Sequence, residues 1–147
     1  GEGGHFINTA SMAGHVASPG MGPYHATKFA VVGYSEGMEG ELAESNIGVS
    51  VLCPAWVKTN IHRSTLDKPT GGGDENSAQF QQMDEVINAG LNPADVAEWT
   101  AKCVEDGRLY VFTHPEFAGF IEQRHARIKA DYAACGEVPA FQKPAAD

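Results

Sequence analysis

Residues 22–33 read G-P-Y-H-A-T-K-F-A-V-V-G, and they place Tyr24 and Lys28 four positions apart. This spacing puts both side chains on one face of a helix, which the sequence predicts from about Tyr24 to Ser45. A tyrosine hydroxyl ordinarily titrates at about 10, and a positive charge nearby favours its ionised form. A tyrosine beside a lysine is therefore suited to act as a general base near neutral pH.

The segment before this helix supplies a hydroxyl group. Residues 3–14 read G-G-H-F-I-N-T-A-S-M-A-G. The short apolar run at 5–9 predicts a buried parallel strand, and the stretch 12–23, rich in glycine, proline and small residues, predicts a loop. Ser11 lies just after the strand and thirteen residues before Tyr24. Its hydroxyl could therefore hold a substrate oxygen beside the tyrosine.

A tyrosine and a lysine at this spacing also occur by chance as an exposed helix pair, so the surrounding motifs matter. Residues 47–59 read I-G-V-S-V-L-C-P-A-W-V-K-T. They predict a second strand from Val49 to Cys53, ended by Pro54. In this order and at these spacings, the three stretches together resemble the second half of enzymes of the short-chain dehydrogenase/reductase family.

The resemblance implies an oxidoreductase that moves a hydride between NAD or NADP and the CH–OH group of an alcohol or the matching carbonyl. It implies that Tyr24 is the general acid/base and that Lys28 favours the tyrosine anion and binds the nicotinamide ribose. Ser11 would orient the substrate oxygen and stabilise its developing charge. His15 and Met21, in the loop between Ser11 and Tyr24, are further substrate-binding candidates.

The turn after the second strand is the other implied cofactor contact. Residues 54–59, P-A-W-V-K-T, are similar to the family's P-G-x-V-x-T turn. The resemblance implies that Pro54, Ala55, Val57 and Thr59 bind the cofactor together with Tyr24 and Lys28. The Val57 backbone and the Thr59 hydroxyl would contact the nicotinamide amide. Ala55 replaces the usual glycine, which would cost roughly 1 kcal/mol if the position required a positive φ.

The glycine-rich half of such an enzyme is not expected in this chain. Family members open with a strand, a glycine-rich turn and a helix that hold the cofactor pyrophosphate. No G-x-x-x-G-x-G pattern occurs near the start of the sequence. The chain is therefore expected to be a C-terminal portion of the family's fold.

The predicted fold is α/β, the C-terminal part of a Rossmann-like doubly wound parallel sheet with three strands and three helices. One partial domain is expected over residues 1–147, with a substrate-loop region at 60–91 and an irregular tail at 136–147. The run Gly71-Gly72-Gly73-Asp74 is predicted to be mobile. The remaining elements are a helix at 92–106 capped by Asn92, a strand at 109–113 and a helix at 115–134.

Composition argues against nucleic-acid and membrane partners, while the resemblance implies a small-molecule alcohol or carbonyl as substrate. The 147 residues carry 10 Lys and Arg against 19 Asp and Glu, a net charge of −9. Nucleic-acid binding requires clustered basic residues, which this acidic sequence lacks. No apolar run approaches the ~20 residues that span a bilayer. The three cysteines are far apart and predict no metal site, which favours a reducing cytoplasm. A homo-oligomer is expected.

Two alternatives remain open from the sequence. The chain could be a non-catalytic remnant that associates with itself or a partner through an exposed apolar sheet edge and the 24–45 helix. A hydrolase is the more distant alternative, because Ser11 lacks the G-x-S-x-G pattern of such enzymes.

Overall fold

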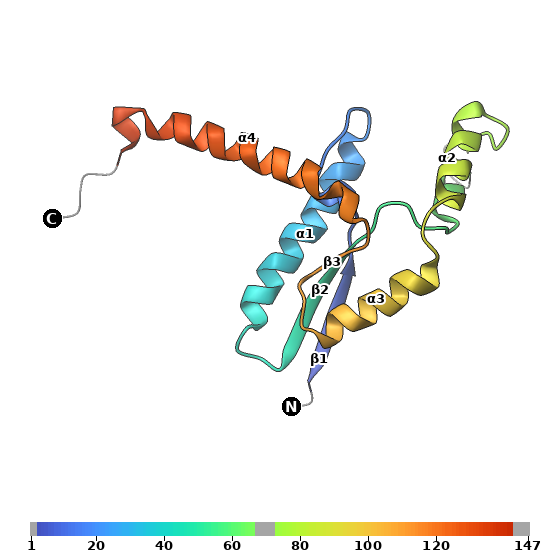
Figure 1. The fold of residues 1–147 in the computed structure, drawn as a ribbon, viewed down its shortest axis with the longest axis horizontal. Coiled ribbons are helices and arrows are strands. Elements are labelled where there is room, and N and C mark those ends of the chain that lie inside the picture. Colours follow the sequence, from blue (N-terminus) through green and yellow to red (C-terminus); the bar gives the residue numbers. More distant parts are fainter. Residues whose placement is uncertain (1–2, 67–72, 143–147) are drawn as a thin grey trace. The chain divides into compact units, whose positions relative to one another are not determined.

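The computed structural model of the chain describes residues 3–66 and 73–142. One sheet contains three parallel strands in the order β1-β2-β3. These strands are β1 (Gly4–Thr9), β2 (Ile47–Cys53) and β3 (Tyr110–Phe112). Figure 1 shows the sheet between helix α1 (Gly22–Leu42) and helix α3 (Pro93–Glu105). The predicted α/β fold with three parallel strands is confirmed.

The described residues divide into two compact units, one ending at His114 and one beginning at Pro115. The first contains the sheet, α1, α3 and a further helix, α2 (Ala78–Asn88). The second consists of a 3-10 turn at Pro115–Phe117, helix α4 (Ala118–Gly136) and another 3-10 turn at Pro139–Phe141. The helix predicted at 115–134 is thus present, with its first turn wound as 3-10 helix.

Helix α2 was not predicted, so the described chain contains four α-helices rather than three. Ser77 caps it, because the Ser77 hydroxyl accepts a hydrogen bond from the Phe80 amide at 3.2 Å. Ile87 is its one buried residue, and together with Phe80 and Met83 it recurs at helical spacing in a stretch otherwise rich in polar residues. The glycine run predicted to be mobile falls at Gly71 and Gly72 outside the described residues.

Helix α3 begins and ends as the sequence predicted. The Asn92 side chain accepts a hydrogen bond from the Ala94 amide at 2.9 Å, and Pro93 occupies the first helical position. Gly107 follows the helix with φ of +67°, a left-handed conformation that favours glycine. Local cap chemistry therefore sets both boundaries of this helix.

The core lies on β2, which is the central strand. Val51 and Cys53 are fully buried and alternate along the strand, so they share one face of the sheet. They pack with Ala10 and with Val32 of α1. On the opposite face, the Ser50 hydroxyl donates to the Arg108 carbonyl at 2.6 Å. Both faces of β2 are therefore covered, as expected for a parallel sheet.

Strand β1 forms one edge of the sheet, with β2 as its neighbour in the part of the chain that the structure describes. Phe6 and Ile7 on this strand are 50% and 48% exposed. An apolar edge strand of this kind is open to pairing with another chain.

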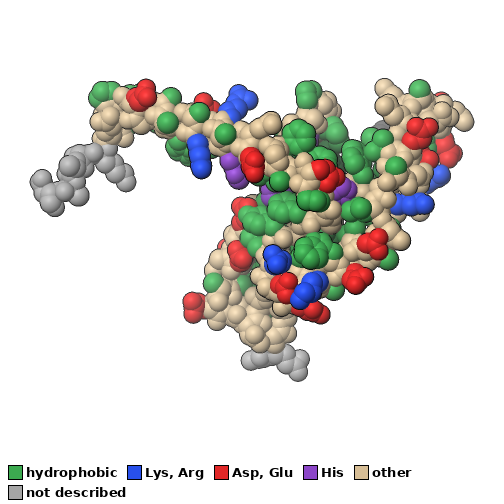
Figure 2. All heavy atoms as spheres, viewed as in Figure 1, with side chains coloured by type: hydrophobic (Ala, Val, Ile, Leu, Met, Phe, Trp, Pro, Cys, Tyr) green, Lys and Arg blue, Asp and Glu red, His purple; other side chains and the backbone are tan. Residues whose placement is uncertain are grey.

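Charged side chains of both signs are interspersed on the surface. Figure 2 shows Lys and Arg side chains (blue) among Asp and Glu (red). Lys102 Nζ lies 2.7 Å from Asp106 Oδ1, and Arg108 Nε lies 3.5 Å from Asp106 Oδ2. Exposed pairs like these contribute little to stability.

Among the helices in 3–66 and 73–142, none is both long and apolar enough to cross a bilayer.

Tyr110 joins β3 to α1, and its ionisation should make the free energy of unfolding depend on pH. Its hydroxyl donates to Glu36 Oε1 at 2.5 Å. Burial and this carboxylate raise the pKa of Tyr110 to about 12. An unfolded tyrosine ionises at about 10, so the stability that this hydroxyl supplies is complete below that pH and is lost as pH rises towards about 12.

We therefore expect the free energy of unfolding to fall as pH rises above about 10, and to fall less steeply in Tyr110→Phe. Urea denaturation on both sides of this pH measures the slope. Tyr34→Phe is the control, because Tyr34 is 64% exposed. Equal alkaline slopes in the wild type and Tyr110→Phe would contradict the assignment.

Candidate functional site

The candidate site lies where β1 and β2 end. Ser11 follows β1 and Pro54 follows β2. The Ser11 hydroxyl donates to the Pro54 carbonyl at 3.3 Å, and the Met12 amide donates to the same oxygen at 2.9 Å. In parallel α/β sheets, ligands bind outside the carboxyl ends of the strands. The contacts therefore place Ser11 at the carboxyl ends of the strands, where a ligand is expected to bind.

The Ser11 side chain is held by a short 3-10 turn, Met12–Gly14. Ser11 caps this turn, because its Oγ accepts a hydrogen bond from the Ala13 amide at 3.1 Å. At 3.3 Å the hydrogen bond that Ser11 donates to Pro54 is long. A substrate oxygen could therefore compete for the hydroxyl hydrogen while the Ala13 amide keeps Ser11 in place.

Tyr24 and Lys28 lie together in the first turns of α1. Lys28 Nζ is 5.7 Å from the centroid of the Tyr24 ring, within the range of a cation–π contact. Lys28 Nζ also donates to the Thr9 carbonyl at the end of β1, at 3.3 Å. Tyr24 is 36% exposed, so a ligand can reach it. The ammonium group thus bridges the tyrosine and the strand that leads to Ser11.

Gly14 allows the Ser11 turn to lie against α1. A Cβ at this position would be 2.7 Å from the Lys28 carbonyl oxygen and 2.8 Å from Val32 Cγ2. Both distances are shorter than normal van der Waals contact, so a side chain here would force the turn away from the helix. The close approach brings Ser11, Tyr24 and Lys28 into one region.

His25 is a residue of this region that sequence reasoning missed. It follows Tyr24 in the sequence but is only 8% exposed. Its ring contacts the Ala13 carbonyl and the Ser18 amide, at 2.9 and 3.0 Å. A histidine next to the motif tyrosine was the available signal, but its partners are visible only in the folded chain.

The turn at 54–59 is anchored on two sides. The Ala55 amide donates to His114 Nδ1 at 3.3 Å. The Leu91 amide donates to the Trp56 carbonyl at 2.9 Å, and Val57 pairs with Leu91 in a parallel bridge. In the described part of the chain, no residue other than glycine has a positive φ. Ala55 therefore occupies the usual glycine position without backbone strain.

Gly90 explains how closely this turn and the segment before α3 approach each other. A Cβ at Gly90 would lie 2.6 Å from the Trp56 carbonyl carbon and oxygen. Further along the turn, the exposed Thr59 hydroxyl oxygen accepts a hydrogen bond from the Ile61 amide at 3.4 Å. The side chain of Trp56 is 44% exposed. The turn therefore presents an aromatic ring and a hydroxyl to solvent.

The two remaining substrate candidates have different environments. Met21 immediately precedes α1 and is 44% exposed. The His15 ring instead packs edge-on against Phe112, with centroids 5.1 Å apart, and its Nε2 lies 3.3 Å from Cys53 Sγ. Burial raises the pKa of Cys53 to about 12, so its thiol remains protonated. The structure thus places His15 against the end of the sheet.

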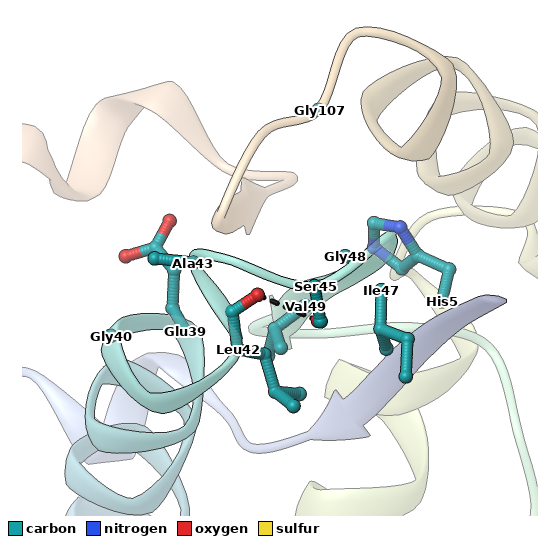
Figure 3. A pocket seen from close by; sticks show the side chains of 10 residues that line it. All are labelled: His5, Glu39, Gly40, Leu42, Ala43, Ser45, Ile47, Gly48, Val49 and Gly107. Carbon is teal, nitrogen blue, oxygen red and sulfur yellow. Dashed lines mark hydrogen bonds between the residues drawn. The ribbon is translucent and has the colours of Figure 1, made fainter. Parts of the chain in front are cut away.

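A separate hollow of about 470 Å³ occurs at the end of α1 remote from Tyr24. Figure 3 shows His5, Glu39 and Gly107 among the residues that line it. None of the predicted catalytic residues contributes to this hollow. In 3–66 and 73–142, no three His, Cys, Asp or Glu side chains are grouped as metal ligands would be.

Known proteins resemble the chain along most of its length. The family model for short chain dehydrogenases matches residues 1–70. The CLA biosynthesis dehydrogenase/reductase of Lactiplantibacillus plantarum is 36% identical over 138 residues, which cover 86% of this chain and 48% of that protein. The C alpha-dehydrogenase of Sphingobium sp. (strain SYK-6) is 34% identical over 132 residues, which cover 87% of this chain and 43% of that protein.

The fold also resembles that of solved structures. A crystal structure of a short-chain dehydrogenase/reductase from Burkholderia phymatum, in complex with NAD, matches with a TM-score of 0.77 and 31% identity. The match covers 99% of this chain and 53% of that chain. The chain therefore spans about half the length of the relatives it matches.

Proposed function

Because this chain belongs to the short-chain dehydrogenase/reductase family, we propose that it carries the proton-transfer and nicotinamide-binding part of an NAD- or NADP-dependent oxidoreductase. The reaction interconverts an alcohol and a carbonyl compound. The observation that carries the proposal is the grouping of Ser11, Tyr24 and Lys28 where the first two strands end. The non-catalytic alternative leaves that grouping without a role, and we do not favour it.

In the proposed mechanism, Tyr24 is the general acid/base. Its phenol oxygen removes the hydroxyl proton of the alcohol during oxidation and returns a proton to the carbonyl oxygen during reduction. The Lys28 ammonium group, 5.7 Å from the ring centroid, stabilises the negative charge that Tyr24 carries as a base. The Ser11 hydroxyl releases the Pro54 carbonyl and donates to the substrate oxygen, which stabilises its developing charge.

The residues present fit the nicotinamide end of a dinucleotide. A bound cofactor of this class supplies the hydride acceptor for oxidation and the hydride donor for reduction. Lys28 would hold the ribose, and the Val57 backbone with the exposed Thr59 hydroxyl would hold the amide. Pro54 and Ala55 set the course of that turn. Its anchoring to His114 and Leu91 supports this role, because a rigid turn can fix the orientation of the ring.

The region at 60–91 is proposed to cover the substrate, with His15 and Met21 as further contacts. Within it, the 3-10 segment Ile61–Thr65 is tied to α2, since His62 Nε2 lies 2.8 Å from Asp84 Oδ1. Asn88 Nδ2 donates to the other Asp84 oxygen, also at 2.8 Å. These contacts join the segment Ile61–Thr65 to α2, and both would lie over an alcohol or carbonyl substrate. A cytoplasmic location and a homo-oligomeric state are part of the same proposal.

Cofactor binding is the direct test. Reduced nicotinamide accepts energy from tryptophan, so NADH or NADPH should quench Trp56 saturably. Lys28→Ala removes a charged hydrogen-bond donor worth ~1.5–3 kcal/mol, and we expect the affinity to fall about tenfold or more.

Two controls accompany the titration. Trp56→Phe should reduce the quenching, because the other tryptophan, Trp99, then remains as the only energy donor. Lys129→Ala, an exposed substitution on α4, should leave the affinity unchanged. A lack of saturable quenching at millimolar cofactor, or quenching that Lys28→Ala does not weaken, would contradict the proposed nicotinamide site.

A further inference from the structure

We propose that His25 is a positioning residue for Ser11: its imidazole holds the segment from Ser11 to Ser18 against the start of α1. The catalytic consequence rests on the function proposed above for Ser11 and Tyr24. The positioning itself is a property of the folded chain, and it can be measured without turnover.

The His25 ring connects the helix to two points of the preceding segment. His25 Nδ1 lies 2.9 Å from the Ala13 carbonyl oxygen. His25 Nε2 lies 3.0 Å from the Ser18 backbone nitrogen and 3.2 Å from the Ser18 hydroxyl. With the residue 8% exposed, these bonds are largely shielded from water. The ring therefore fastens both the middle and the end of the segment.

These contacts define one tautomer of the ring. The backbone amide of Ser18 can only donate, so His25 Nε2 must accept and carries no hydrogen. The hydrogen then resides on Nδ1, where it is donated to the Ala13 carbonyl. The imidazole is thus neutral, with both nitrogens engaged by the same segment. Neither nitrogen is left to exchange a proton with substrate, so His25 acts by position.

The connection to Ser11 passes through a single residue. The Ala13 amide donates to Ser11 Oγ at 3.1 Å, and the Ala13 carbonyl accepts from His25. Both backbone polar groups of Ala13 are therefore used, one towards the catalytic hydroxyl and one towards the imidazole. Loss of the imidazole would leave the Ala13 carbonyl without this partner, and the Ala13 amide that orients Ser11 would be held only by the remaining hydrogen bonds of the turn.

A further anchor of the segment, besides the packing of Gly14 and His15, is at its start. The Pro54 carbonyl accepts from the Met12 amide and from Ser11. This anchor ties the segment to the end of β2, whereas His25 ties it to α1, which carries Tyr24. Because Tyr24 and His25 are adjacent in the helix, a ring fixed to the Ser11 segment contributes, with the close approach at Gly14, to the separation between the Ser11 and Tyr24 hydroxyls.

The test is NMR of the full chain, combined with three substitutions of His25. Nitrogen-15 spectra of the histidine rings should show a hydrogen on Nδ1 and none on Nε2 for His25. In His25→Ala, the amides of Ala13 and Ser18 should exchange with solvent about tenfold faster or more, since their local protection is lost. The amide of Val51 in the core should keep its wild-type rate.

Two conservative variants separate the two ring contacts. The amide group of asparagine can replace the Nδ1–H donor, so His25→Asn should keep Ala13 protected while Ser18 is released. The side-chain oxygen of glutamine can replace the Nε2 acceptor, so His25→Gln should keep Ser18 protected. His125→Ala, on the exposed surface of α4, should alter neither rate. This selective rescue would not follow from a merely structural contribution to stability.

Three results would overturn the proposal: a hydrogen on Nε2, unchanged exchange of Ala13 and Ser18 in His25→Ala, or an equal acceleration at Val51. Activity is a separate measurement. In a form of the chain that oxidises an alcohol, His25→Ala should lower kcat about tenfold or more without changing the KM for the cofactor, and His25→Asn should restore most of it. Wild-type protein that shows the exchange pattern but no turnover would contradict the proposed function and leave the positioning role supported.

Discussion

Replacing Tyr24 with phenylalanine is expected to lower kcat by about 10²- to 10⁴-fold, the range that a positioned acid/base group contributes. Phenylalanine keeps the ring beside Lys28 but removes the oxygen that accepts the substrate proton. Tyr24 is 36% exposed, so loss of its hydroxyl should leave the unfolding temperature close to that of the wild type. The expected result is therefore a folded protein that still binds cofactor but does not turn over.

The measurement is NAD- or NADP-linked alcohol oxidation, paired with a cofactor titration on the same samples. Tyr34→Phe is the matched control, because it makes the same change in the same helix at a side chain that is 64% exposed. It should retain wild-type kcat. Substantial turnover by Tyr24→Phe would eliminate the proposed proton transfer, whatever the cofactor affinity.

Gly14→Ala is expected to destabilise the chain and disturb the site together. The added methyl group would approach the Lys28 carbonyl oxygen to 2.7 Å and Val32 Cγ2 to 2.8 Å. Since the first of these atoms belongs to the helix backbone, no side-chain rotation can relieve the contact. Overpacking of this kind costs ~1–3 kcal/mol, and relief requires the Ser11 turn to move away from α1.

Urea denaturation measures the loss, and Gly37→Ala provides the contrast. A Cβ at Gly37 would have no obstructing atom within 4 Å, and the residue lies inside α1. There alanine should stabilise the helix by ~0.5–1 kcal/mol. Opposite signs for the two substitutions are therefore expected. A Gly14→Ala protein as stable as the wild type would show that the turn does not need this close approach.

Several elements could be predicted because their signals are local. The i, i+4 spacing of Tyr24 and Lys28 places both on one helix face wherever the helix packs. Asn92 and Pro93 start α3 with contacts inside a single turn. The family resemblance, read from three short motifs, is confirmed by the relatives and by the matching fold. Helix α2 was missed although Phe80, Met83 and Ile87 recur at helical spacing, because the stretch around them is rich in polar residues.

The roles of the histidines could not be predicted in this way. His25 is separated by 12 positions from Ala13, and His114 by 59 positions from Ala55. Nothing in the composition near either histidine identifies such partners. Both rings accept or donate to backbone groups, and every residue except proline carries the same backbone groups. The choice among them depends on how the loops fold over the sheet.

The residue pattern alone therefore specified the α/β order of elements, the pairing of Tyr24 with Lys28 and the family. Helical and strand periodicities and cap contacts act over a few positions, so they can be read along the chain. Other contacts depend on packing between segments distant in sequence. They are the hydrogen bond from Ser11 to Pro54, the close approach at Gly14 and the hydrogen bonds of His25. Such contacts form only when burial of the β2 core draws those segments together, and for that reason they required the folded chain.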